Sequence, residues 1–430
     1  MYYPSVENSV LQIVKNHFKN FNEQKLFLLL LLLFPIFLVT VRHWISTFFS
    51  MIVLVSLTSW FRNRQQKVNL DRDEKILLWA FLLFFVVFLL TSLVNGWGKE
   101  QTRYLGSEVR FVFFIPVYLA IRKVDGAIKW LTAGMVLGIV AIFFNSILDS
   151  DAHIDGRYMS IYGPLFTGPV TGLMAVLVLI NVRFEQRLWV KGLFVIAVVL
   201  AVTPIVLSDA RSAYFVIPLL LLGVALSISK GLIKMLTLAV VLLGIIGVYY
   251  GADNIHNRAK KTLKQYRVYF AYLSSPKTQN KLSGVGVRLE MWRITPRFVK
   301  DHTVFGVGRG NYQKHAQRYV ESDGFHKDIA MHSHPHNAYS EALVSKGLLG
   351  LIVFLGITLL PLLMMLRDYF RGHASALYAI YLIIGYLLFS FFDASTFIKG
   401  NFVALYIILL SVFFSHHIRT RQQQQQPTTE

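Results

Sequence analysis

Long, nearly unbroken runs of apolar residues decide what this chain can fold into. The clearest are Leu26–Val41 and Ile76–Val94, and they are too long and too apolar for a core helix of a soluble domain. An α-helix needs about 18 to 20 consecutive apolar residues to cross the hydrocarbon core of a bilayer. Hydrophobic residues make up 55% of the 430-residue chain. We therefore predict an all-α, polytopic helical integral membrane protein.

The apolar runs predict about twelve membrane spans, separated by short polar loops. They lie at 26–41, 44–61, 76–94, 105–121, 127–148, 159–180, 188–207, 213–229, 231–250, 347–366, 374–391 and 401–415. With the N-terminus in the cytoplasm, the inner loops and tails hold 20 Lys and Arg, and the short outer loops hold 6. Because Lys and Arg accumulate on the cytoplasmic side of a membrane, this skew supports the layout and places both termini inside.

The net charge of +20 would suggest nucleic-acid binding in a soluble protein. Here the basic cytoplasmic loops of a membrane protein account for most of it, and no nucleic-acid partner is expected. The chain has no Cys, which excludes disulfides, a thiolate nucleophile and Cys metal ligands. Met1–Lys25 shows no cleavable signal pattern, so the first span is expected to be retained.

One long loop, residues 251–336, falls on the outer side and holds 15 Lys/Arg against 6 Asp/Glu. Long loops translocate regardless of their charge, so its basic character does not contradict the topology. Within it, Lys260–Phe270 suggests either an amphipathic helix on the membrane surface or a solvated basic face. A basic loop above a bilayer suits a substrate that carries a diphosphate or many negative charges.

The chain is therefore expected to divide into four parts. These are nine spans in 1–250, a large catalytic loop in 251–346, three spans in 347–415 and a disordered cytoplasmic tail in 416–430.

The stretch His332–Gly350 holds the residues best suited to chemistry. His332, His334 and His336 alternate, and Pro335 favours an extended backbone before it, so the three rings are expected on one face. Such a set could ligate a metal ion, but no Asp/Glu-rich partner segment is evident elsewhere in the loop. One His could instead be a general base, or the segment could be a polar loop without chemistry. The residues alone leave all three interpretations open.

Further motifs flank the histidines in a fixed order. Arg288-Leu-Glu-Met-Trp292 and Phe305-Gly-Val-Gly-Arg-Gly-Asn-Tyr312 precede them, and Gly347-Leu-Leu-Gly350 opens the next span. No βαβ unit surrounds the glycines, so they predict a tight turn rather than a nucleotide site. The ordered set R-x3-W, F-G-x-G, H-N-x-Y-x-E and G-L-L-G resembles the O-antigen ligase and polymerase superfamily. The resemblance is close over residues 284–356, and the many-span layout with one large late outer loop also matches.

The resemblance implies an O-antigen ligase, a glycosyltransferase of lipopolysaccharide biosynthesis. Such an enzyme moves a glycan from undecaprenyl diphosphate to lipid A–core oligosaccharide at the periplasmic face of the inner membrane of a Gram-negative bacterium. His336 matches the H-N position of the family and is expected to be the base, with His334 and then His332 behind it. Arg288 and Arg211 are expected to hold the diphosphate, without a metal or another cofactor, and the reaction is expected to invert the anomeric centre.

The resemblance implies further substrate-binding residues, which lie in these motifs except for Arg157, found where the family carries another outer-face arginine. They are Arg157, His334, Asn337, Tyr339, Glu341 and Arg309. Glu341 could orient His336 or only cap the following helix. Glu108 and Arg110 lie inside a span and are candidates for lining a cavity.

Two rival functions remain. The nearest is the related polymerase, which joins glycan repeats on the same lipid carrier; the basic loop and the H-N motif favour the ligase. The other is a transporter or flippase for the lipid-linked glycan. That function predicts polar residues at the midplanes of the spans and broken helices in matched halves. Here the charged residues lie mostly at the outer ends of the spans. The oligomeric state does not follow from the sequence.

Overall fold

The computed structural model describes residues 23–62, 68–154, 157–228, 253–274 and 284–425, with six isolated residues between 231 and 282. Its helices are α2 (Glu23–Ile36), α3 (Trp44–Arg62), α4 (Arg72–Val94), α5 (Lys99–Glu108), α6 (Arg110–Ile121), α7 (Ala127–Leu148), α8 (Pro164–Ile180), α9 (Leu188–Ser208), α10 (Arg211–Ile228), α12 (Asp253–Ser274), α13 (Val285–Asp301), α14 (Tyr312–Asp323), α15 (Ala338–Phe370), α16 (Leu377–Phe392), α17 (Ser395–Ile398) and α18 (Gly400–Gln425). Short 3-10 turns are η1 (Ser150–Ala152), η2 (Asn181–Arg183), η3 (Lys327–Met331) and η4 (Ala374–Ala376), and β1 (His153–Ile154) pairs with β2 (Arg157–Tyr158) as an antiparallel hairpin.

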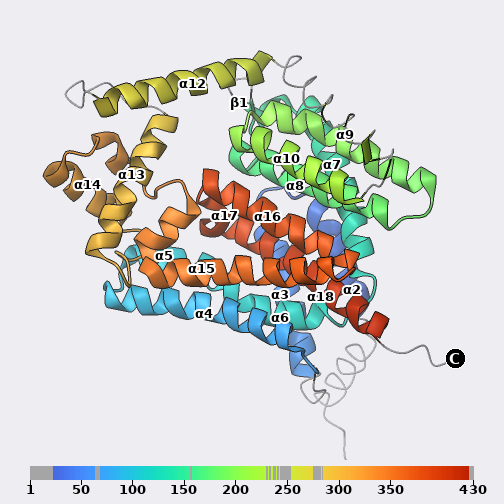
Figure 1. Ribbon diagram of the computed structural model, residues 1–430. Helices are drawn as coiled ribbons and strands as arrows, with labels where there is room; N and C mark the ends of the chain where they lie inside the picture. Colours follow the sequence, from blue (N-terminus) through green and yellow to red (C-terminus); the bar gives the residue numbers. More distant parts are fainter. Residues whose placement is uncertain are drawn as a thin grey trace, which may run out of the picture.

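The predicted all-α membrane fold is confirmed. Among the described residues, ten helices are long and apolar enough to cross a membrane, and each coincides with one of the predicted spans. The predicted span 26–41 corresponds to α2, a 14-residue helix followed by turns. The predicted span 231–250 lies almost wholly outside the described residues. Figure 1 shows the long helices side by side, with α12, α13 and α14 gathered at one end of the bundle.

Three helices form the centre of the bundle. In the 18-residue apolar stretch of α18, 89% of the residues are buried inside the protein. In the corresponding stretch of α9, at the periphery, 28% are buried. Helices α8 and α16 are also mostly buried, and α18 packs against α6, α3 and α16. Because the outer helices expose apolar side chains such as Trp79, Leu93 and Trp189, the surface of the bundle suits contact with lipid.

The helix α18 continues further than the sequence suggested. Residues 416–425 were predicted to belong to a disordered tail, and this is wrong because α18 runs to Gln425. The guanidinium of Arg421 lies 2.5 Å from Asp71, 3.1 Å from Asp73 and 2.6 Å from Asp368. These carboxylates come from distant parts of the chain, and they fix the last turns of the helix at the end opposite to α12–α14 (Figure 1).

The described residues of the predicted outer loop, 251–336, form a folded helical unit with its own apolar core. Side chains of α12, α13, α14 and η3 form this core, which includes Tyr269, Met291, Phe298 and Ile329. The predicted helix at Lys260–Phe270 lies within α12, and its residues Gln265, Tyr269 and Tyr272 face inward. Its exposed face carries both apolar residues, such as Phe270, and cations, so its contact with a membrane surface stays a prediction.

The glycine motif of residues 305–310 packs against a break in α15. Gly347 has φ +67° and interrupts the helix, and Gly306 has φ +63°. A Cβ added to Gly347 would lie 2.3 Å from the carbonyl oxygen of Val304. A Cβ added to Gly306 would lie 2.5 Å from the carbonyl oxygen of Val344. The glycines are therefore needed for a positive φ and for close backbone approach, as the tight-turn interpretation predicted.

Glu290 is a buried charge that links α13 to α12 and to the segment before η3. Its carboxylate accepts hydrogen bonds from the Arg293 guanidinium (2.7 and 2.8 Å), the Tyr269 hydroxyl (3.1 Å) and the backbone N–H of His326 (3.1 Å). Burial raises the pKa of Glu290, but the bonds from Arg293 and His326 outweigh it and hold the pKa below its usual value. The stabilisation is therefore present above about pH 4.3 and is lost as the pH falls below that value.

We expect Glu290→Ala to destabilise the loop unit by on the order of 3 kcal/mol, because it leaves the Arg293 guanidinium and the Tyr269 hydroxyl without their shared partner. The measurement is proteolytic cleavage within residues 253–336 of the intact protein at several temperatures. The exposed Glu321→Ala on α14 is the matched control. Equal cleavage of both variants would contradict a central role for Glu290.

Candidate active site

The segment His332–Asn337 enters α15 and is anchored at several points. The side chain of Asn337 caps the helix by accepting hydrogen bonds from the backbone N–H groups of Tyr339 and Ser340, both at 3.0 Å. Its amide also donates to the Phe391 carbonyl at 3.0 Å, and Trp292 of α13 donates to the Pro335 carbonyl at 3.2 Å. The H-N motif and the Trp of R-x3-W therefore fix one short segment between three helices.

The three histidine rings lie together, as the alternation predicted. The ring centroids of His332 and His336 are 5.3 Å apart, and those of His334 and His336 are 4.5 Å apart. The backbone is extended at His332, but His336 has φ +50°, so the segment is not extended throughout. A left-handed conformation at a residue other than glycine is uncommon, and His336 adopts it directly before the Asn337 cap.

Asp393 lies beside His336 and is the main residue that the sequence analysis missed. It follows α16, and its carboxylate oxygen Oδ1 lies 3.8 Å from Nδ1 of His336. The same oxygen accepts a hydrogen bond of 2.9 Å from the backbone N–H of Ser395. Burial raises the pKa of Asp393, but His336 and the Ser395 N–H outweigh it and hold the pKa well below its usual range. Asp393 is therefore a carboxylate at neutral pH.

The other two histidines favour the neutral form. Burial, together with the charge of the neighbouring His336, lowers the pKa of His334 to about 3. Burial also lowers the pKa of His332, together with the charges of His336 and Arg288. The hydroxyl of Ser333 lies 3.0 Å from Nδ1 of His334.

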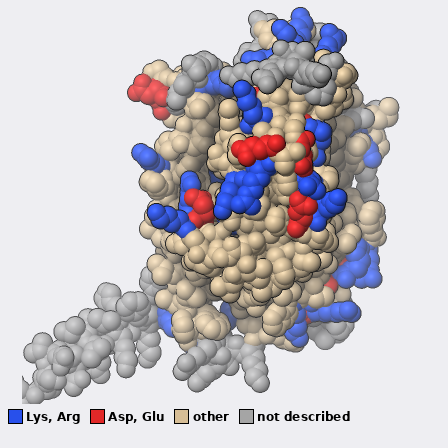
Figure 2. Space-filling view, turned by 90° about the vertical axis from the view of Figure 1, so that its left-hand side faces the viewer, with Lys and Arg blue, Asp and Glu red and all other residues tan. Residues whose placement is uncertain are grey.

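Three arginines from separate segments approach one another near the histidines. Arg157 of β2 pairs with Asp209 at 3.1 Å, and Arg211, which opens α10, donates to Gln265 of α12 at 3.1 Å. Arg288 is close enough for its charge to act on both Arg211 and His332. Along α13 it lies between Val285, whose N–H donates to the same Gln265 oxygen as Arg211, and Trp292, which donates to Pro335 of the histidine segment. Figure 2 shows the end of the molecule that carries α12, α13 and α14, where Lys and Arg side chains gather near the centre of the face with acidic groups around them.

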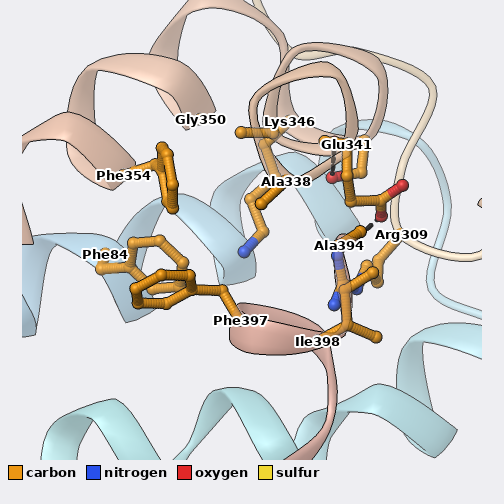
Figure 3. Close-up of a pocket in the computed structure, with 12 residues that line it drawn as sticks. Phe84, Arg309, Ala338, Glu341, Lys346, Gly350, Phe354, Ala394, Phe397 and Ile398 are labelled. Atoms are coloured by element: carbon orange, nitrogen blue, oxygen red, sulfur yellow. Dashed lines mark hydrogen bonds and ion pairs between the residues drawn. The ribbon is translucent and has the colours of Figure 1, made fainter. Parts of the chain in front are cut away.

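Arg309 and Glu341 belong to a separate, buried ion cluster (Figure 3). Arg309 donates to Glu341 at 2.6 Å and lies 3.5 Å from Glu108, and Lys346 contacts both oxygens of Glu108 at 2.9 Å. The four side chains are at most 7% exposed. Two positive and two negative charges balance one another around a cavity of about 20 Å³, enough for one water molecule.

The contacts of Glu341, Glu108 and Arg110 change the interpretation of these residues. Glu341 pairs with Arg309 and not with His336, so the suggestion that it orients His336 is wrong. Glu108 pairs with Lys346, whereas Arg110 donates to the Gly400 carbonyl at 2.5 Å and to Ser46 at 3.2 Å. Substrate binding by Arg309 or Glu341 stays a prediction, and their contacts in the structure are internal.

The Tyr339 hydroxyl also makes a hydrogen bond within the protein. Its hydroxyl donates to the Leu387 carbonyl of α16 at 3.1 Å, one turn before the Phe391 carbonyl that Asn337 contacts. Both side chains therefore tie the start of α15 to α16 and so position the histidine segment.

The fold and the site describe a polytopic helical membrane protein with an Arg–His–Asp group at one end of the bundle. Residues 196–355 match the family model described as O-Antigen ligase, which confirms the resemblance to the O-antigen ligase superfamily. A protein of Haemophilus influenzae described as uncharacterized is 23% identical over 322 residues, covering 72% of this chain and 77% of that protein. The family match supports a function of the ligase or polymerase type on lipid-linked glycans. The matched residues, 196–355, include Arg211, Arg288 and all three histidines, whereas Arg157 and Asp393 lie outside the matched range.

Proposed function

We propose that this protein is an O-antigen ligase that transfers a glycan from undecaprenyl diphosphate to lipid A–core oligosaccharide. The observation that carries the proposal is the position of Arg288 on α13. The helix begins with Val285, whose N–H shares the Gln265 oxygen with Arg211, and one turn after Arg288 the Trp292 side chain donates to Pro335 of the histidine segment. A donor whose diphosphate lies at these arginines would present its anomeric carbon toward His336. The reacting groups of donor and acceptor would then meet within one site.

The arginines stabilise the leaving group. When the bond between the anomeric carbon and the diphosphate oxygen breaks, its electron pair remains on the diphosphate, which gains negative charge. Guanidinium groups bind phosphate oxygens through two parallel N–H bonds, and a fixed group of them stabilises the charge as it develops. Arg157 is held by Asp209, so Arg211 and Arg288 are the first candidates for direct contact.

His336 removes the proton from the acceptor. In the proposed arrangement the Nδ1–H group points toward the Asp393 carboxylate, which leaves Nε2 with the lone pair that accepts the hydroxyl proton. The acceptor oxygen attacks the anomeric carbon from the side opposite to the diphosphate and inverts the centre. At 3.8 Å from Nδ1 the Asp393 carboxylate is too far for a hydrogen bond, so Asp393 acts as a positioning residue through its negative charge, which favours the tautomer with the proton on Nδ1.

A phosphorylated acceptor suits the surface of α12. Lys260, Lys261, Lys264 and Arg267 are all exposed, and no acidic residue lies between Lys260 and Ser274. Lipid A–core carries phosphate groups that such a basic row attracts, which favours the ligase over the polymerase.

The test supplies the purified protein with a polyprenyl-diphosphate glycan, with and without lipid A–core. We expect transfer only when the lipid acceptor is present, measured as a shift of the acceptor on a gel. Growth of the glycan on its carrier in the absence of lipid A–core would instead identify a polymerase. Movement of the intact donor across a vesicle membrane without transfer would identify a flippase.

The proposal also requires the loop unit to face the periplasm. The chain has no Cys, so single cysteines report topology directly. In spheroplasts we expect an impermeant maleimide to label Ser322→Cys on the exposed face of α14. Gln423→Cys, exposed near the end of α18, should react only after permeabilisation. The reverse pattern of labelling would contradict the orientation and the proposed place of the reaction.

A further inference from the structure

Two ring nitrogens in the histidine group are buried without a hydrogen-bond partner. They are Nε2 of His334 and Nδ1 of His336, and both lack a partner among the described residues. Buried polar atoms are nearly always hydrogen-bonded, so each such atom calls for an explanation. The buried carboxylate of Asp393, which carries a full negative charge, lies beside them.

The spacing of the three side chains fits a metal ion better than a hydrogen bond. One nitrogen from each histidine and one oxygen of Asp393 all lie within 4.8 Å of one another. The 3.8 Å between His336 Nδ1 and Asp393 Oδ1 exceeds the length of a hydrogen bond. It is shorter than about 4.1 Å, twice the usual distance from zinc to an imidazole nitrogen or a carboxylate oxygen. An ion between the two atoms could therefore bind both after only small side-chain movements.

We propose that His334, His336 and Asp393 form a binding site for a divalent transition-metal ion such as zinc. Two imidazoles and one carboxylate select first-row transition metals over Mg²⁺ and Ca²⁺, which prefer oxygen ligands. The three ligands leave one position of a tetrahedral site for water. The charges of Arg309 and Lys399 also reach this group, so we expect weaker binding than at a structural zinc site.

If His336 is the base, as in the proposed function, an ion bound to its ring also regulates the transfer. A metal bound to Nδ1 of His336 takes the position of the proton that faces Asp393. The remaining proton then resides on Nε2, which can no longer accept the proton of the acceptor hydroxyl. The same ion neutralises Asp393 and withdraws it from orienting the ring. Zinc is therefore an inhibitor of the transfer and not its cofactor.

Calorimetric titration of zinc into the full-length protein tests the site without substrate. The protein carries no polyhistidine tag, because a tag would bind zinc itself. We expect one saturable site, with affinity reduced more than about tenfold in His334→Ala and in Asp393→Asn. His315→Ala is the matched control. His315 belongs to a different histidine pair, in which the ring centroids of His302 and His315 are 4.9 Å apart. Unchanged binding in both site variants, or loss in His315→Ala, would overturn the site.

A second arm measures transfer at increasing zinc concentrations and again after excess EDTA. We expect inhibition to follow the binding curve and EDTA to restore the full rate. Zinc that binds at this site without slowing transfer would overturn the regulatory role. Because binding is measured without donor or acceptor, failure of the proposed ligase reaction would leave the binding result interpretable.

Discussion

His336→Ala is expected to reduce the rate of glycan transfer by about 10²–10⁴-fold while the protein still folds. The substitution removes the nitrogen that accepts the hydroxyl proton, and no other group in the site replaces it in the same position. The His336 backbone has φ +50°, which alanine also disfavours, so His336→Asn provides a second variant that tolerates this conformation. The measurement is the initial rate with purified protein that elutes as a single species.

His332→Ala is the matched comparison, because it removes a histidine 5.3 Å away, between ring centroids, in the same segment. We expect a clearly smaller loss of rate. If His332→Ala abolishes transfer and His336→Ala is nearly normal, the base belongs to a different histidine and the family alignment of the H-N motif does not apply here.

Arg288→Lys and Arg211→Lys should each lose about 10²-fold or more in transfer rate although the positive charge remains. A planar guanidinium grips the diphosphate at two oxygens, whereas an ammonium acts as a point charge. Arg211 also donates to Gln265 of α12, a contact that lysine would not reproduce in the same geometry. The measurement is the rate at a saturating concentration of the donor.

Arg318→Lys provides the control for these variants, since Arg318 is exposed on α14 and belongs to no part of the proposed site. It should transfer glycan at the wild-type rate. Full activity in both Arg288→Lys and Arg211→Lys would contradict a direct grip on the diphosphate by these two side chains.

The membrane fold could be predicted because hydropathy and charge act locally along the chain. Every span that the structure confirms was predicted from an apolar run such as 76–94. Polar residues are rare in these runs because they are costly in lipid. The end of α18 was not visible. Its polar last turns are held by Arg421 and three distant carboxylates, a contact that local composition does not reveal.

The candidate site could be predicted only in part, because contacts between distant segments do not follow from local sequence. The histidines and the Asn337 cap lie in one short segment, so their clustering followed from spacing. Asp393 lies more than fifty residues later and reaches His336 only through the packing of α16 against α15. A lone acidic residue at the end of an apolar span was the signal that could have found it. The ion cluster of Glu108, Arg309, Glu341 and Lys346 likewise joins segments that the sequence keeps apart.

The central claim is that arginines and one histidine transfer the glycan without a metal. The most direct measurement supplies purified, tag-free protein with polyprenyl-diphosphate glycan and lipid A–core in the presence of excess EDTA. We expect one polyprenyl diphosphate to be released for each glycan transferred, with an inverted anomeric linkage in the product. Loss of transfer in EDTA, with recovery after addition of one divalent ion, would contradict it. The cluster of His334, His336 and Asp393 would then be a catalytic metal site.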